Sequence, residues 1–160
     1  MSNVLNSPVF RMAALDDVDD LVSLRVLMQQ EIYDSEKYPL TDNYLNLLRE
    51  YFAKKIESKG YVSAVADLNG KLVSANGLIL YQKPPAITGG NGLIGYISNV
   101  YTVPAWRRKG IGKELMKMLV EHARQMEVTE LHLWSTEDGK GVYQSLGFGD
   151  PDLAALQLHF

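Results

Sequence analysis

The sequence predicts an α/β or α+β protein in which helices pack against a mixed β-sheet. Two kinds of segment alternate along the chain: amphipathic segments with helical spacing, and short runs rich in β-branched and aromatic residues. Asn69-Gly70 separates two such runs, which is a strong signal for a two-residue hairpin turn. Runs at 92–103 and 129–135 flank a helical pattern, and as adjacent parallel strands they would form a right-handed crossover. A chain of 160 residues suits one domain over 1–160.

The N-terminal part predicts a strand followed by a helix. The strand covers Val9–Ala13, and Asp16 or Asp17 is expected to cap a helix that runs to about Gln30. One face of this helix carries Leu21, Leu24, Arg25 and Met28.

A loop and a second helix are expected next. The loop covers Glu31–Leu40, and Thr41 or Asp42 is the expected cap of a helix that ends near Ser58. Its apolar face is strongly periodic and is assigned to packing: Tyr44, Leu47, Leu48, Tyr51, Phe52, Lys55 and Ile56.

The middle of the chain predicts a hairpin and then a central strand. Tyr61–Ala66 and Leu72–Leu80 are the two hairpin strands, and Gln82–Asn91 is a loop. The apolar run Leu93–Val103 is the central strand, which Pro104 ends because proline has no N–H for a sheet ladder.

The C-terminal part predicts a third helix, a strand, a short helix and a last strand. The third helix follows the basic turn, with Ile111, Leu115, Met118, Leu119, His122 and Met126 at helical spacing. Beyond it, the expected elements are the strand Thr129–Ser135, the helix Asp138–Leu146 capped by Gly147, and the strand Leu153–Phe160.

The turn between the central strand and the third helix has the chemistry of an anion site. A helix N-terminus leaves N–H groups unpaired and carries a partial positive charge. Gly110 and Gly112 allow close approach to that backbone, and Arg107, Arg108 and Lys109 add positive charge. The turn therefore suits a phosphate or pyrophosphate, and the alternative is a solvated basic turn. The chain has neither a P-loop nor a G-x-G-x-x-G motif, which argues against ATP or NAD held in the usual way.

Two motifs carry a resemblance to a known family. Arg107-x-x-Gly110-x-Gly112 resembles the [RQ]-x-x-G-x-[GA] motif of the GNAT N-acetyltransferase superfamily, and Tyr143-x-x-x-Gly147-Phe148 resembles a second segment common there. The order of the elements is also similar over nearly the whole chain. The resemblance implies a mostly antiparallel sheet flanked by helices, with a splayed parallel strand pair at the cofactor site.

The resemblance also implies an activity and a set of residues. The activity is transfer of an acetyl group from acetyl-CoA to a primary amine of a small molecule or peptide, and the alternative is a non-catalytic acyl-CoA-binding regulatory module. Tyr143 would be the general acid that protonates the leaving thiolate. The implied cofactor-binding residues are Tyr101, Thr102, Val103, Arg107, Arg108, Lys109, Gly110, Ile111, Gly112 and Lys113.

The acceptor side departs from the family pattern. The family often places a carboxylate on or near the central strand, whereas no acid lies between Gly92 and Val103. The expected substrate residues are Glu31, Tyr33, Ser98 and Asn99. The base stays open between the first-loop acids Glu31, Asp34 and Glu36 and a water held by Ser98 or Asn99. These acids favour an amine-bearing substrate.

Composition limits the remaining classes. The chain has no cysteine, which excludes disulfides and thiolate sites, and its three histidines lack metal-ligand spacing, so we expect no metal. A net charge of −3 argues against general nucleic-acid binding. We expect no membrane span and no signal peptide, and therefore a cytoplasmic protein. The resemblance adds a possible homodimer with the last strand as its interface.

Overall fold

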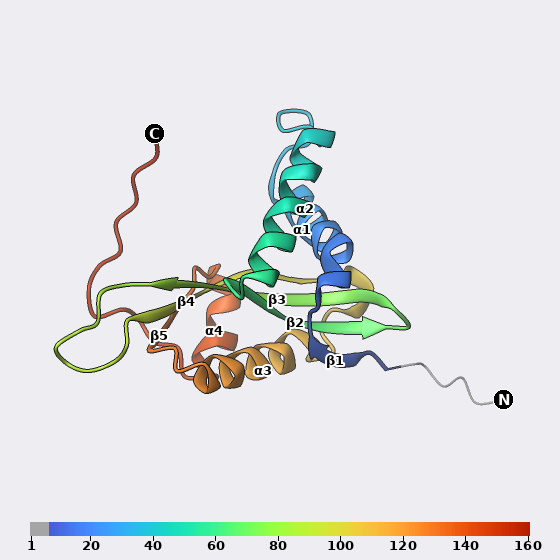
Figure 1. Cartoon of the computed structure of the whole chain (residues 1–160). Coiled ribbons are helices and arrows are strands. Elements are labelled where there is room, and N and C mark those ends of the chain that lie inside the picture. The colour runs from blue at the N-terminus through green and yellow to red at the C-terminus, as the bar shows by residue number, and fades with distance from the viewer. Residues whose placement is uncertain (1–6) are drawn as a thin grey trace.

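A five-stranded sheet between two layers of helices forms the body of the protein in the computed structural model, which describes residues 7–160 (Figure 1). The strands lie in chain order across the sheet: β1 (Val9–Met12), β2 (Tyr61–Leu68), β3 (Lys71–Gln82), β4 (Leu93–Thr102) and β5 (Glu130–His132). Neighbours are antiparallel except β4 and β5, which are parallel. This confirms the predicted mixed, mostly antiparallel sheet.

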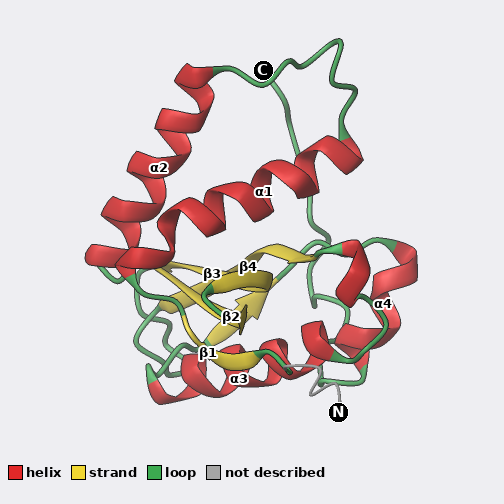
Figure 2. Cartoon of the chain, turned by 90° about the vertical axis from the view of Figure 1, so that its right-hand side faces the viewer, coloured by secondary structure: helices red, strands yellow, loops and turns green. Residues whose placement is uncertain are grey.

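Helices lie on both faces of the sheet (Figure 2). The helices are α1 (Val18–Ile32) and α2 (Asp42–Glu57) on one face, and α3 (Ile111–Gln125) and α4 (Glu137–Gln144) on the other. One core lies under α1 and α2 and includes Leu24, Phe52 and Tyr61. The other lies under α3 and includes Leu78, Ile97 and Leu115. Short 3₁₀ turns at Leu15–Asp17 and Pro104–Trp106 precede α1 and α3.

Local sequence explains most of the element ends. Asn69 and Gly70 both have positive φ, as the tight turn between β2 and β3 requires. Thr41 caps α2, because its Oγ1 accepts a hydrogen bond from the Tyr44 N–H at 3.2 Å. Gly147 follows α4 with a φ of +96°.

The start of α1 differs from the prediction. Asp17 holds the N-cap position of α1, which begins at Val18, but its side chain makes no capping bond to the helix. The Asp17 carboxylate instead accepts bonds from the Arg11 guanidinium at 2.7 and 2.8 Å and from the Ala14 N–H at 2.7 Å. The bonds from Arg11 hold the pKa of Asp17 below its ordinary value. Asp17 therefore ties β1 to the turn that enters α1.

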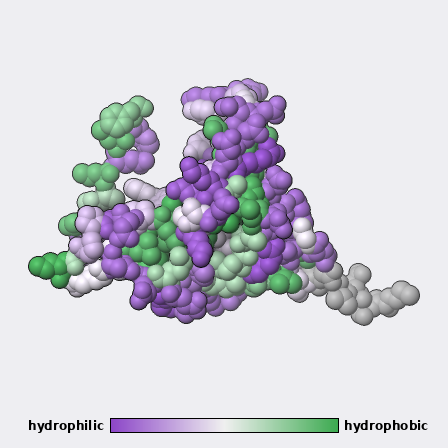
Figure 3. Space-filling model, in the orientation of Figure 1, coloured by the Kyte–Doolittle hydropathy of each residue, from purple (hydrophilic) through white to green (hydrophobic). Residues whose placement is uncertain are grey.

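The predicted strand Leu153–Phe160 is wrong, because residues 151–160 form neither helix nor strand. A strand needs a partner ladder, and the residues described here give this stretch none. Its apolar side chains are exposed, with Leu156 at 94%. In Figure 3 the C-terminal stretch stands apart from the body of the molecule.

A bulge in the β3–β4 ladder changes the faces that β4 presents. Ala75 pairs with Tyr101 and Gly77 pairs with Ser98, so two residues of β4 lie opposite Asn76 alone. Ile97 and Tyr101 would share a face in a regular strand, because side chains alternate. Here Ile97 packs in the α3 core and Tyr101 packs in the core under α1 and α2. The bulge thus aims Tyr101 at α1.

The Leu115→Ala variant tests the α3 core. The Leu115 side chain is fully buried, so its truncation leaves a cavity and should lower the free energy of unfolding by about 3 kcal/mol. Urea denaturation measures this loss. Leu47→Ala on α2 is the control, because Leu47 is 56% exposed and its truncation should cost less than about 0.5 kcal/mol. Equal losses in the two variants would contradict this description of the core.

Candidate active site

The turn into α3 leaves the start of that helix open. Gly110 precedes the helix with a φ of +78° and offers no side chain to cap it. A Cβ built at Gly110 would meet no atom within 4 Å, so the space over the turn is open to a ligand. Uncapped N–H groups at a helix N-terminus attract anions. The turn thus leaves open the N–H groups that the predicted anion site requires.

Three exposed cations surround this turn. Arg108, Lys109 and Lys113 make no ion pair with any carboxylate within residues 7–160. The Lys109 ammonium lies 4.3 Å from the centre of the Trp106 ring, which restricts where it can move. Ile111 is buried in the core, so only its backbone can face a ligand. The turn therefore combines open N–H groups with unpaired positive charge.

Arg107 has a different setting from the other basic residues of the turn. Its Nη2 lies 2.7 and 2.9 Å from the two carboxylate oxygens of Glu31 at the end of α1, and its Nε donates to the Thr102 carbonyl at 2.8 Å. The Tyr101 hydroxyl also donates to Glu31, at 2.6 Å. These bonds hold the pKa of Glu31 below its ordinary value. Arg107 therefore links the turn to α1, and its charge is already matched.

The end of β4 is held from the β3 side. The Val103 N–H donates to the Val73 carbonyl at 3.0 Å, and the Ser74 hydroxyl donates to the Tyr101 carbonyl at 3.0 Å. Thr102 Oγ1 lies 2.7 Å from the Ser74 hydroxyl. On the opposite side, β5 pairs only with Ile94–Tyr96, so β4 and β5 separate before the turn. The open edge of β4 therefore begins beyond Tyr96.

Asn76 joins the sheet to the first turn of α3, and the sequence analysis missed it. Its side chain is fully buried, and its Nδ2 donates to the Gly112 carbonyl at 2.8 Å. Its Oδ1 is buried without a partner among the residues described here. A polar residue inside the apolar strand Leu72–Leu80 was the available signal. Asn76 holds the start of α3 over β3.

Asn99 places a polar cluster on the face of β4 toward α1. It lies in the bulge with a φ of +55°. Its Oδ1 accepts a bond from the Arg25 guanidinium of α1, and its Nδ2 donates to the Tyr61 hydroxyl at 3.3 Å. Both ends of the Asn99 side chain are thus used, whereas its neighbour Ser98 pairs with Gly77 in the ladder. Arg25 was expected only as part of the packed face of α1.

Tyr33 lines a cavity at the far end of α1. The cavity has a volume of about 660 Å³ and lies between the end of α1, residues 33–41 and the start of α2. Tyr38 and Tyr44 also line it, and the rings of Tyr33 and Tyr38 meet edge to face at 5.9 Å. Glu31 does not line this cavity, although it lies two residues before Tyr33 in the chain.

Tyr143 lies near the end of α4, packed against the α3 core. Its ring contacts Phe148 edge to face at 6.0 Å. The hydroxyl makes no hydrogen bond within residues 7–160. Burial raises the pKa of Tyr143, so the phenol keeps its proton at neutral pH.

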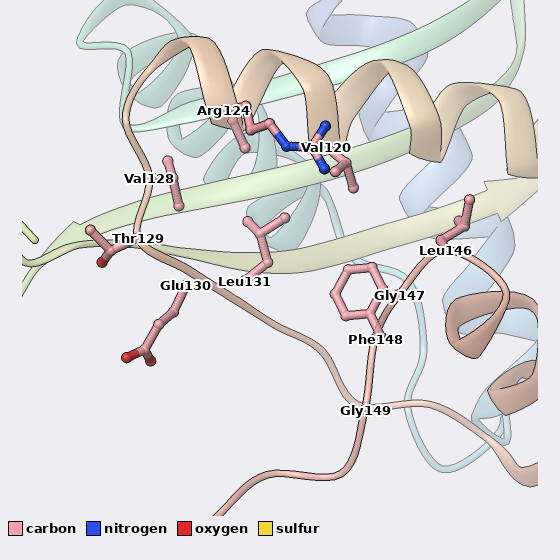
Figure 4. A pocket seen from close by; sticks show the side chains of 11 residues that line it. Val120, Arg124, Val128, Thr129, Glu130, Leu131, Leu146, Gly147, Phe148 and Gly149 are labelled. Carbon is pink, nitrogen blue, oxygen red and sulfur yellow. The ribbon is translucent and has the colours of Figure 1, made fainter.

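A second hollow lies away from the basic turn that precedes α3. It has a volume of about 440 Å³ and lies between the C-terminal part of α3, β5 and residues 146–149 (Figure 4). Leu131 and Phe148 line it, and it does not include the residues of the basic turn. Over residues 7–160, no cluster of acids and histidines has the form of a metal site, and no helix is both long and apolar enough to cross a bilayer.

Comparison with known sequences places this site in context. The sequence model described as the acetyltransferase (GNAT) family matches residues 21–148. An uncharacterized N-acetyltransferase of Escherichia coli (strain K12), YjgM, is 26% identical over 96% of this chain and 90% of its own length. Glucosamine 6-phosphate N-acetyltransferase of Trypanosoma brucei brucei is 32% identical, over 49% of this chain and 52% of its own length.

Solved structures share the fold along nearly the whole chain. A predicted acetyltransferase with acetyl-CoA from Clostridium acetobutylicum superposes with a TM-score of 0.80 at 28% identity, covering 94% of this chain and 95% of that one. A GCN5-related N-acetyltransferase from Ralstonia eutropha JMP134 gives a TM-score of 0.74 at 21% identity, covering 94% and 97%.

The Asn76→Asp variant tests the bond between β3 and α3. The substitution keeps the shape but replaces the buried donor by a carboxyl group that repels the Gly112 carbonyl when ionised. Burial raises the pKa of the introduced carboxyl above its unfolded value of about 4. The variant should therefore unfold about 2 kcal/mol more easily than the native protein at pH 7.5, with a smaller loss at pH 4.5.

Urea denaturation at both pH values measures these losses. Asn46→Asp is the matched control, because Asn46 is exposed on α2 and its change should cost little at either pH. A loss for Asn76→Asp that is the same at both pH values would contradict the buried-donor account.

Proposed function

Because this chain belongs to the acetyltransferase (GNAT) family, we propose that it transfers an acetyl group from acetyl-CoA to a primary amine of a small molecule or peptide, within a single domain over 1–160. The observation that carries the proposal is the open, uncapped N-terminus of α3 among unpaired cations. It is where the chain can neutralise a pyrophosphate.

The chain's own groups fit CoA in two places. The N–H groups at the start of α3, from Ile111 to Lys113, would bind the pyrophosphate, with Arg108 and Lys109 beside it. β5 pairs with β4 only at Ile94–Tyr96 within the described residues, so the edge of β4 at residues 101–103 would bind the extended arm of CoA as an added strand. The N–H of Val103 is already bonded to Val73, so other backbone groups of this edge would serve the arm. A related structure bears acetyl-CoA in its name, which supports this cosubstrate.

Acetyl-CoA supplies a thioester whose carbonyl carbon accepts the amine. An acceptor that arrives as an ammonium ion would first lose one proton to a base. The amine nitrogen would then form the C–N bond as the C–S bond breaks, and it would lose a second proton while the thiolate takes one. Tyr143 suits the proton transfer to the thiolate, because its hydroxyl is protonated and has no partner within residues 7–160. A positioned acid of this kind typically contributes 10² to 10⁴ in rate.

Glu31 suits a role as a fixed negative charge rather than as the base. Its carboxylate already accepts bonds from Tyr101 and Arg107, and its lowered pKa makes it a weak acceptor of another proton. Asp34 and Glu36 are both exposed in the following loop, where the Asp34 carboxylate accepts the Glu36 N–H at 2.9 Å. Both ends of the Asn99 side chain are already bonded, so a water held by the Ser98 hydroxyl is the remaining route for the base.

A non-catalytic acyl-CoA-binding module is the second candidate. It would keep the open turn and the arm-binding edge but show no turnover with any amine.

The cytoplasmic location and the homodimer expected from the sequence stay predictions. The exposed apolar side chains of residues 153–160 support a self-association surface there.

The Tyr143→Phe variant tests the proposed chemistry. With saturating acetyl-CoA and an amine that the native protein acetylates, the variant should lower kcat about 100-fold or more, because only the hydroxyl is lost. Thiol release measures turnover, and calorimetric titration of acetyl-CoA measures binding. Tyr81→Phe at the exposed end of β3 is the control and should leave kcat unchanged.

The outcomes separate the two candidates. Binding of acetyl-CoA near one site per chain without turnover of any amine would favour the regulatory module. An unchanged kcat for Tyr143→Phe would remove the general-acid role alone. Absence of acetyl-CoA binding would sink the proposal as a whole.

A further inference from the structure

Arg25 carries a positive charge that no carboxylate matches within residues 7–160. It projects from α1 toward the sheet and is partly buried. Its guanidinium bonds to the neutral amide of Asn99 and enters no ion pair. A guanidinium has five N–H donors in a fork that matches carboxylate and phosphate. Arg25 therefore has donors to spare.

Arg25 is held in place by residues that cannot neutralise it. Asn99 is itself held by the hydroxyl of Tyr61, a buried residue whose pKa burial raises to about 12. Tyr61 thus stays neutral at physiological pH. Tyr51 is close enough for the charge of Arg25 to oppose the rise that burial causes in the pKa of Tyr51. The three polar neighbours are neutral, and they position the guanidinium rather than pair it.

The charges beside β4 are therefore unevenly matched. Asn99 contacts Arg25, and Tyr101, two residues further along β4, contacts Glu31. Glu31 has Arg107 as a partner, whereas Arg25 has none. The net charge offered on this face of β4 is positive. The acid-rich first loop favours an acceptor with a positive charge. The unmatched guanidinium of Arg25 favours an acceptor that also carries a negatively charged group.

We propose that the acceptor amine carries an acidic group, a carboxylate or a phosphate, which the guanidinium of Arg25 binds while Glu31 and its neighbours face the amine. This deepens the proposed function and rests on it. The separation of the two contacts along β4 suits an acid a few bonds from the nitrogen. Arg25 acts as a specificity-determining residue, because an amine without the acid leaves this partly buried cation unmatched.

Matched pairs of acceptors test the proposal. One pair is an α-amino acid and its carboxamide, and the other is O-phosphoethanolamine and ethanolamine. The native protein should favour the acidic member of at least one pair by about tenfold or more in kcat/KM. Which pair shows the preference distinguishes a carboxylate from a phosphate acceptor.

The Arg25→Gln variant assigns that preference to the guanidinium. It should lower kcat/KM for the acidic member about tenfold or more, chiefly through KM, and change its neutral partner less than about twofold. Arg25→Lys keeps the charge and should restore part of the preference. Arg49→Gln is the control, because Arg49 pairs with Asp19 on the exposed surface of α2 and should change neither member.

The readouts separate this inference from the proposed function. Calorimetry should give the same affinity for acetyl-CoA in Arg25→Gln and the native protein. Equal kcat/KM for both members of each pair, or an equal loss for both in Arg25→Gln, overturns the inference and leaves the acetyltransferase intact. Acetyl-CoA binding with no turnover of any acidic amine also overturns it. Absence of acetyl-CoA binding overturns the proposed function, and the inference falls with it.

Discussion

The bulge opposite Asn76 is the constraint on which the rest of the site depends. Because two residues of β4 share one position on β3, the strand changes the face that it presents. Ile97 packs below the sheet, whereas Asn99 meets Arg25 and Tyr101 meets Glu31 above it. Without the extra residue, Tyr101 would turn toward α3, and Glu31 would lose a hydrogen bond. One inserted residue thus brings α1 into the site.

The same region also positions α3, whose N-terminus is the proposed anion site. Asn76 of β3 bonds to the Gly112 carbonyl on the sheet side of α3, and Arg107 bonds to Thr102 and to Glu31 of α1. The turn into α3 is therefore held on both sides, while its N–H groups and its unpaired cations stay open. Arg107 and Asn76 thus position the turn. The other basic residues, Arg108, Lys109 and Lys113, pair with no carboxylate within residues 7–160. The sequence suggests the same anion-binding role for all the basic residues of the turn, whereas in the structure Arg107 alone among them is paired with a carboxylate, that of Glu31, within residues 7–160.

Sequence reasoning reached most of the fold because its signals are local. The Asn69-Gly70 turn, the cap at Thr41 and the strand–turn–helix at 93–125 depend on neighbouring residues, and each appears in the structure. The errors came from long-range partners. The Asp17 side chain bonds to Arg11 of β1 instead of to the first turn of α1, and residues 153–160 lack the partner ladder that a strand requires. Arg25 and Asn76 both lie within apolar sequence patterns, which give no sign of their roles. Only the folded chain shows that Arg25 has no carboxylate partner within residues 7–160 and that the buried Asn76 bonds to the Gly112 carbonyl.

The measurement that tests the central claim most directly is a map of backbone amide shifts on ¹⁵N-labelled protein as acetyl-CoA is added. The account predicts the largest changes at residues 108–113, with a second group at 101–103 on the open edge of β4. Changes confined to the hollow beside β5, around Leu131 and Phe148, with none at the start of α3, would contradict it.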